Sequence, residues 1–277
     1  AVKNAEVIIV DDASTDNSIE MLRENYPHVK ILARDKNKGF SAAVNDGVKK
    51  ASGELVVLLN SDVIPEENFL DSLLPHFVSE EIFAVGCLEK SQENGKTIFS
   101  GRGIGCYQRG FLMHRKGDVG EKNTLWVSGG AGMFRKKIWE TLGGLDLLYN
   151  PFYWEDIDLS YRAVKRGYKI AFEDKSVVIH THSEGSIQNI YSPAEIKTIA
   201  YRNQFFFVWL NITDLDFLFK HFIFIPFHLI KALISFDFPL IKGFFLAILK
   251  LPHVLSHRLK NQKKNTLSDK EVFRNIS

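Results

Sequence analysis

The first 90 residues alternate between short apolar runs and longer stretches of amphipathic patterning. The apolar runs are rich in β-branched residues, which is typical of buried parallel strands. They are "EVIIV" (6–10), "VKILAR" (29–34), "ELVVLLNSD" (54–62) and "IFAVGCLE" (82–89). The stretches between them begin with capping residues or with proline and acids, as helices do. This pattern predicts an α/β fold with a mostly parallel, doubly wound sheet flanked by helices.

After about residue 90 the alternation becomes irregular. The stretch 96–114 is punctuated by glycines and indicates a hairpin or an irregular excursion. A Gly-rich turn, a strand and a short helix are expected over 126–144. A further helix is expected from about Glu155, and late strands at 169–172 and 176–182.

The last part of the chain has a different composition, since twelve of the 22 phenylalanines lie between Phe205 and Phe245. We therefore expect two regions, residues 1–190 and a helical region over 191–277. Lysines, an aspartate and prolines interrupt the apolar stretch 218–255, so no spanning helix is predicted. Short apolar helices with interspersed Lys and His favour a membrane interface. An ordinary helical subdomain packed on the sheet is the alternative.

The composition excludes several classes of protein. A net charge of +2 argues against a dedicated nucleic-acid binder, and two cysteines are too few for a disulfide framework or a cysteine-built metal site. The sequence contains neither a P-loop motif nor a G-x-G-x-x-G after the first strand, so the usual phosphate and dinucleotide sites are disfavoured. A reducing compartment is the natural setting.

Acidic residues follow two of the predicted strands, where ligands of open α/β sheets bind. Asp11 and Asp12 end the first strand, and Asn60 and Asp62 end the third. Helix capping is one interpretation of these residues. The other is a divalent cation held by oxygen ligands, which would bridge to the diphosphate of a nucleotide.

A third acidic group follows the aromatic run of residues 152–154. It comprises Glu155, Asp156 and Asp158 at the start of a predicted helix. These acids could stabilise the helix dipole, or one of them could act as a base.

Five motifs in order resemble the family 2 glycosyltransferases, and in particular the bacterial rhamnosyltransferase-like branch. They are "VIIVDDASTDNS", "NKGFSAAVNDGVKKASGELVVLLNSD", "SGGAGMFRKKIWETLGGLD", "YWEDIDLSYRAVKRGYKI" and "VVIHTHSEGS", between about residues 6 and 186. The resemblance implies a Rossmann-like GT-A fold, a dTDP- or UDP-sugar donor, a divalent cation (Mg²⁺ or Mn²⁺) and inversion at the anomeric carbon.

The resemblance also implies roles for individual residues. Asp156 matches the catalytic base, and Glu155 would tune its proton affinity. Asp62 matches the main metal ligand, with His180 as the second ligand and His182 as its alternative. The remaining matches surround the donor sugar-nucleotide, and they are Asp11, Asp12, Gly39, Asn45, Asn60, Ser61, Gly129, Gly130 and Trp154. Trp154 would give a sugar ring a flat apolar wall, and Arg162 and Arg202 could contact the diphosphate.

The family normally has another strand and helix before "VIIVDD", whereas here five residues precede Glu6. We therefore expect an N-terminally truncated domain whose sheet has an exposed edge.

Three functional hypotheses follow from the sequence. The first is an inverting glycosyltransferase, peripheral on the cytoplasmic face of the cell membrane, that builds cell-surface polysaccharide on a saccharide or lipid-linked acceptor. The second is sugar transfer to a polyprenyl phosphate, which needs no general base. The third is a non-catalytic domain that binds sugar nucleotides.

Overall fold

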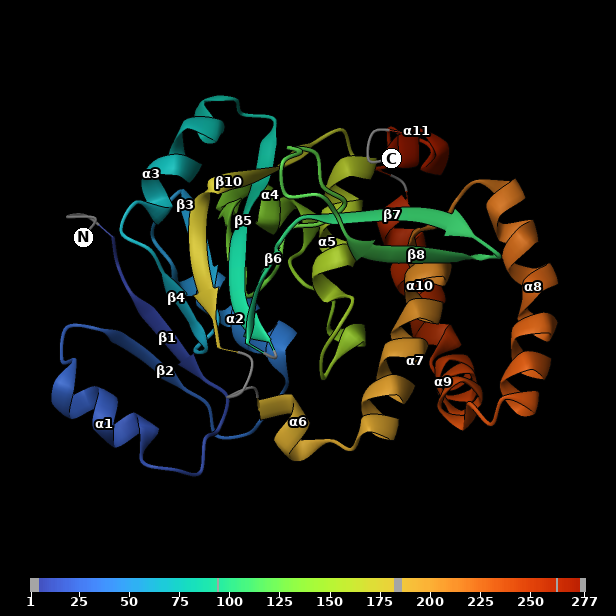
Figure 1. The fold of residues 1–277 in the computed structure, drawn as a ribbon, viewed down its shortest axis with the longest axis horizontal. Coiled ribbons are helices and arrows are strands. Elements are labelled where there is room, and N and C mark those ends of the chain that lie inside the picture. Colours follow the sequence, from blue (N-terminus) through green and yellow to red (C-terminus); the bar gives the residue numbers. More distant parts are fainter. Residues whose placement is uncertain (1–4, 94, 182–185, 263, 275–277) are drawn as a thin grey trace.

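The computed structural model describes residues 5–93, 95–181, 186–262 and 264–274. A mixed sheet with helices packed around it forms one part of the molecule, and long helices from the C-terminal region form the other (Figure 1). The α/β class predicted from the strand–helix alternation is confirmed.

The strands are β1 (Ile8–Asp11), β2 (Lys30–Ala33), β3 (Leu55–Leu59), β4 (Val63–Pro65), β5 (Ile82–Glu93), β6 (Lys96–Ser100), β7 (Gly103–Gln108), β8 (Phe111–Lys116), β9 (Ala131–Arg135) and β10 (Lys169–His180). The α-helices are α1 (Ser18–Asn25), α2 (Phe40–Lys50), α3 (Phe69–Leu73), α4 (Lys136–Leu142), α5 (Glu155–Lys165), α6 (Ser186–Ile190), α7 (Pro193–Asn211), α8 (Leu215–Ile234), α9 (Phe238–Leu249), α10 (Leu251–Gln262) and α11 (Asp269–Arg274). Two short 3₁₀ helices are η1 (Leu74–Val78) and η2 (Leu147–Tyr149).

The main sheet has the strand order β3-β9-β5-β10-β4, with β6 added to β5. Its β5 and β10 are parallel, but β9 runs antiparallel to both β3 and β5, and β4 runs antiparallel to β10. The sheet is therefore mixed rather than mostly parallel, because β9 returns from the irregular segment in the opposite direction. That segment contains the expected hairpin, formed by β7 and β8.

The apolar strands β1 and β3 are less buried than their composition predicts. Among the described residues, β1 pairs only with β2, and β3 pairs only with β9. No residue of either strand is fully buried, and Leu59 is 42% exposed. One edge of each strand thus lacks a neighbouring strand within the described part of the chain.

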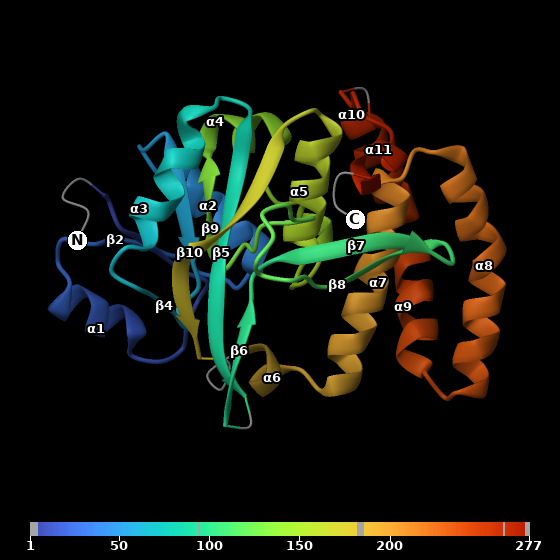
Figure 2. The same ribbon diagram turned by 45° about the horizontal axis from the view of Figure 1, so that its top comes forward.

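The C-terminal helices share a hydrophobic core with the sheet-containing part of the chain. The run Phe205–Leu210 of α7 is completely buried, and it packs with side chains from β8, α5, α9, α10 and α11. Figure 2 shows α7 beside α5 and the hairpin, with α9 and α8 progressively farther out. Residues on both sides of position 190 therefore depend on each other for burial.

Helix α8 is long and apolar enough to span a membrane, whereas no spanning helix was expected from the sequence. It has 20 residues with a mean hydropathy of 1.6, and only 11% of its most apolar window is buried. Its lysines at 220 and 231 are too few to lower this average below what a spanning helix requires. Length and composition alone thus make α8 a candidate span.

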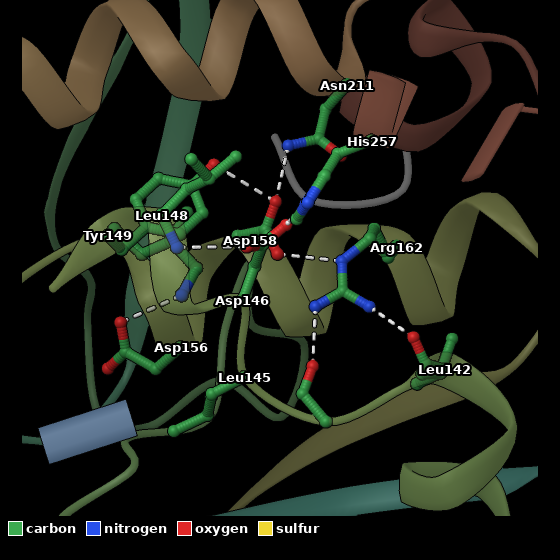
Figure 3. Close-up of polar contacts among 12 residues, drawn as sticks. Leu142, Leu145, Asp146, Leu148, Tyr149, Asp156, Asp158, Arg162, Asn211 and His257 are labelled. Carbon is green, nitrogen blue, oxygen red and sulfur yellow. Dashed lines mark hydrogen bonds and ion pairs between the residues drawn. The ribbon is translucent and has the colours of Figure 1, made fainter. Parts of the chain in front are cut away.

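Helix α5 is held in place by a buried charge network (Figure 3). The Arg162 Nε donates to Asp158 Oδ2 at 2.7 Å, and both side chains are almost completely buried. The other Asp158 oxygen accepts from Tyr149 Oη and Asn211 Nδ2. Because every charged atom has a partner, the pair can remain inside the protein.

A second buried pair connects the C-terminal end of α5 to α11. The Asp269 carboxylate accepts from Lys165 Nζ at 2.7 Å and from Tyr161 Oη at 2.6 Å. It also accepts from the backbone amides of Thr213 and Asp214. One carboxylate therefore joins α5, α11 and the start of α8.

Replacing this carboxylate should be strongly destabilising. We expect Asp269→Ala to lower the free energy of unfolding by about 3–5 kcal/mol, because Lys165 would be left buried and unpaired. Urea denaturation at pH 7 measures the change. The exposed pair Lys270–Asp216 provides the control, and Lys270→Ala should cost less than about 1 kcal/mol. Equal costs for the two variants would show that the buried carboxylate has no special role.

Candidate active site

Asp62 and His180, which lie far apart in the sequence, meet at one end of the main sheet. Pairing of β10 with β4 sets His180 opposite Val63. The His180 Nε2 is 3.3 Å from Asp62 Oδ2, and its Nδ1 is 3.5 Å from Glu89 Oε2. Glu89 and Asp62 together raise the pKa of His180, with Glu89 the larger contribution.

This arrangement fits a divalent cation. Bonds of about 2.1 Å to one ion place adjacent octahedral ligands about 3 Å apart, close to the 3.3 Å between Asp62 Oδ2 and His180 Nε2. A ligating histidine usually has a carboxylate at its other ring nitrogen, as Glu89 is here. The described residues contain no group of three or more His, Cys, Asp or Glu that could hold a metal, so phosphate oxygens and water would have to complete the coordination.

The loop at Gly129 and Gly130 lies between the Asn60 segment and the start of α5. The Asn60 amide donates to the Gly130 carbonyl at 2.9 Å. A side chain at residue 130 would meet Asn60 Nδ2 at 2.5 Å, and one at residue 129 would press on the ring of Phe40. Glycine is therefore required at 130 by the close approach of the two chains. The structure brings Asn60, Gly129, Gly130 and Asp156 together as predicted.

Asp156 lies on the other side of this loop, on the first turn of α5. Its Oδ1 accepts from its neighbour's amide, Ile157 N, at 2.8 Å, and its Oδ2 faces the Gly129 amide at 3.5 Å. Burial raises the pKa of Asp156 to about 6, and the charge of Glu89 adds to the shift. In Figure 3 its carboxylate points away from the Asp158 network. A carboxylate with this pKa can accept a proton near neutral pH.

The other two acids of the group have different environments. Glu155 is buried, and its Oε2 has no hydrogen-bond partner among the described residues. Burial, followed by the charge of Asp156, raises the pKa of Glu155 to about 8. Asp158 serves only the buried network of α5. The group thus combines a structural acid with two acids whose proton affinity is raised.

The expectation that Trp154 forms a flat wall for a sugar is wrong. Trp154 is 6% exposed, and its ring packs against Phe207 and His114. The C-terminal helices cover it, which the local sequence could not show. Its neighbour Tyr153 is 43% exposed and is the aromatic residue that a ligand could reach.

The predicted nucleotide residues form a second group around the start of α2. Asp12 accepts from the amides of Lys38 and Gly39 and from Arg34, so it fixes the turn in which Gly39 adopts a φ of +86°. The carboxylate of Asp11 caps Ser14 N. Asn45 exchanges two hydrogen bonds with the backbone of Leu145.

A shallow cavity of about 360 Å³ lies beside this turn. Arg34, Lys38, Asn45 and Asn150 contribute to its lining. Two cationic side chains in a cavity next to Asp12 suit a nucleotide phosphate or base. Ser61 is exposed between Asn60 and Asp62.

The two arginines proposed for the diphosphate have other partners. Arg162 is buried and bonds to Asp158 and to the carbonyls of Leu142 and Gly144, so it cannot reach a ligand. Arg202 donates to the Asn150 carbonyl at 2.6 Å. His182 lies outside the described residues.

Sequence reasoning missed two residues that the structure places at the site. Glu89 lies in the second half of β5, where the apolar part of the strand ends, within electrostatic reach of both His180 and Asp156. Phe40 packs against Gly129. A charged residue near the end of an otherwise apolar strand was the one available signal for Glu89; Phe40 gave none.

Sequence comparison finds one matching family model and several curated relatives. Residues 1–143, just over half of the chain, match the family model described as Glycosyl transferase family 2. The chain is 25% identical over 195 residues to a pre-mycofactocin glycosyltransferase of Mycobacterium tuberculosis. The matched region covers 66% of this chain and 38% of that protein. It is 30% identical over 178 residues to poly-beta-1,6-N-acetyl-D-glucosamine synthase of Staphylococcus aureus, which covers 61% of this chain and 40% of that protein. The chain therefore spans less than half the length of these curated relatives.

Two solved structures share the fold. GalNAc-T7 with UDP, GalNAc and Mn²⁺ superposes with a TM-score of 0.58 at 18% identity, covering 74% of this chain and 42% of that one. The mannosyltransferase PcManGT from Pyrobaculum calidifontis, with GDP-Man and Mn²⁺, superposes with a TM-score of 0.51 at 16% identity. The match covers 95% of this chain and 67% of that one. The expected GT-A-type fold is confirmed, and the chain belongs to glycosyl transferase family 2.

Proposed function

We propose that this glycosyltransferase is inverting, uses a metal-bound nucleotide-diphosphate sugar, and relies on Asp156 as its general base. One observation carries the proposal. Asp156 and the Asp62–His180 pair flank the loop at Gly129 and Gly130, and Asn60 connects the loop to the Asp62 segment. This arrangement supports a donor position between the proposed base and the proposed cation site.

The residues have separate tasks in this mechanism. Asp156 takes the proton of an acceptor hydroxyl while that oxygen forms a bond to the anomeric carbon. The bond between this carbon and the diphosphate oxygen breaks, and the diphosphate leaves with the electron pair. A divalent cation held by Asp62 and His180 would supply positive charge to the departing diphosphate. Glu89 orients His180, and the glycines leave room for the donor sugar.

The relatives support the choice of donor and product. The two structures that share the fold contain UDP or GDP-Man together with Mn²⁺, and one curated relative is a polysaccharide synthase. We propose a dTDP- or UDP-sugar donor carrying a hexosyl or rhamnosyl group, Mg²⁺ or Mn²⁺ as the cation, and a saccharide or lipid-linked saccharide acceptor in cell-surface polysaccharide synthesis.

The C-terminal region supports a position on the inner face of the cell membrane, with residues 1–190 as the catalytic domain and 191–277 as the membrane-facing region. An apolar surface follows one helical face of α8 and continues over α9. Its large exposed residues are Leu215, Phe219, Phe222, Ile223, Phe227, Ile230, Ile234, Phe238, Phe245, Ile248 and Leu249. Exposed lysines at 220, 231, 242 and 250 accompany it. An apolar face flanked by lysines suits an anionic bilayer surface.

The role of Asp156 predicts opposite effects on activity and stability. We expect Asp156→Asn to lower nucleotide release from the donor by about 10²–10⁴-fold, because no group remains to take the acceptor proton. The same change should raise the free energy of unfolding at pH 8 by about 1–2 kcal/mol, since the pKa is higher in the folded state and the ionised carboxylate is therefore destabilising. This gain should fade as the pH falls from about 6 to about 4, the usual pKa of an unfolded aspartate.

The exposed Asp71→Asn is the control and should leave both quantities unchanged. Unchanged turnover in Asp156→Asn would contradict a general base and would favour transfer to a polyprenyl phosphate. Tight binding of the nucleotide without any release by the wild-type chain would favour a non-catalytic binding domain.

The proposed membrane-binding surface of the protein is tested by introducing negative charge at exposed apolar positions. Phe219→Glu combined with Phe222→Glu should reduce co-sedimentation of the full chain with anionic liposomes at least ten-fold, because two carboxylates would enter the apolar interface. Val78→Glu, an equally exposed position on η1, is the matched control. These substitutions are preferable to deletion after residue 215, which would remove core residues such as Val254 and Phe273. Failure of the wild-type chain to sediment would show that the surface has another partner.

A further inference from the structure

We propose that Asn203, assisted by Arg202, is a positioning residue that holds the segment Tyr149–Trp154 and thereby places the base Asp156. The inference rests on the proposed function for the role of Asp156. It concerns helix α7, which the sequence assigned to a separate region.

Asn203 makes an unusual set of hydrogen bonds for one amide. Its Nδ2 faces three backbone carbonyls of a single segment, those of Tyr149 at 2.8 Å, Phe152 at 2.9 Å and Tyr153 at 2.8 Å. The Asn203 side chain is completely buried. A buried carbonyl without a hydrogen-bond partner costs free energy. The Asn203 side chain provides a partner for three carbonyls of this segment.

Arg202 fixes the orientation of this amide. Its Nε and one terminal nitrogen donate to Asn203 Oδ1 at 2.9 and 2.8 Å, so the Nδ2 must face the carbonyls. The same guanidinium donates to the Asn150 carbonyl at 2.6 Å. Two neighbouring residues of α7 therefore bind four carbonyls of one segment.

The segment needs such support because its backbone is strained. Tyr153 and Trp154 adopt φ values of +70° and +77°, in the left-handed region that large side chains rarely occupy. Each such residue costs on the order of 1–3 kcal/mol and persists only where its surroundings enforce it. The three carbonyls bound by Asn203 belong to this segment and end directly before Trp154.

The conformation of the segment determines where Asp156 points. Trp154 is the residue before the first turn of α5, and its carbonyl accepts from the Asp158 amide at 2.8 Å. The beginning of α5, and hence the direction of Asp156, is set by the left-handed pair. The segment also reaches the other side of the site, where Asn150 Nδ2 donates to the Lys38 carbonyl at 2.7 Å.

A matched pair of variants tests the assignment. Asn203→Leu removes the donor but keeps the branched shape of the side chain. Gln204→Leu removes an amide on the next residue, which donates to the Leu112 carbonyl of β8 instead. Arg202→Met provides a second test at a partly exposed position. This change leaves the buried Asn203 side chain in place. Hydrogen exchange of residues 149–158 is measured in the full chain, together with kcat for nucleotide release as a function of pH.

We expect exchange of residues 149–158 to accelerate at least ten-fold in Asn203→Leu and to a smaller extent in Arg202→Met, with Gln204→Leu like the wild type. The kcat of Asn203→Leu should fall at least ten-fold. The acidic midpoint of its pH profile should fall by about half a unit or more, because a loosened segment admits water to Asp156 and reduces the desolvation that raises its pKa.

Two results would overturn the inference. One is exchange that rises evenly over the whole chain in Asn203→Leu, as general destabilisation would cause. The other is unchanged kcat and an unchanged midpoint despite faster exchange of residues 149–158. A wild-type chain without activity on any donor would instead refute the proposed function, and the exchange measurement would still decide whether Asn203 holds the segment.

Discussion

The site depends on one constraint, which is that α5 must direct Asp156 toward the loop at Gly129 while three of its other charged side chains are satisfied inside the protein. The Arg162–Asp158 pair and the Lys165–Asp269 pair fulfil the second condition. They attach successive turns of the helix to η2, α7 and α11. Because breaking a buried pair is costly, the helix has little freedom to rotate, and its N-terminal acid keeps one direction.

The same burial that positions the acids also determines their chemistry. Asp156 has a raised pKa because water is largely excluded around it and because the charge of Glu89 lies nearby. Asp62 shares the neighbouring space with His180 and retains access to solvent. In the proposed mechanism the two carboxylates have different tasks, one accepting a proton and the other holding a cation, and the difference comes from their surroundings.

The sequence predicted the features that depend on local order. Asp62, His180 and Asp156 stand next to strand ends or a helix start, inside the motifs that resemble family 2 glycosyltransferases, so the sequence marked them as candidates and the structure describes all three. Features that depend on distant contacts could not be predicted. Examples are the antiparallel insertion of β9, the burial of Trp154 under α7, the structural use of Arg162, and Glu89. Asn203 looked like an ordinary helix residue because its partners lie about 50 positions earlier.

The central claim is that Asp62 and Asp156 serve one donor site in separate roles. Calorimetric titration of UDP, with and without Mn²⁺, into the wild-type chain, Asp62→Ala and Asp156→Asn tests it most directly. The account predicts that Mn²⁺ strengthens UDP binding, that Asp62→Ala abolishes this effect, and that Asp156→Asn preserves it. The account would be contradicted if Mn²⁺ did not change the affinity for UDP, or if Mn²⁺ still strengthened UDP binding in Asp62→Ala.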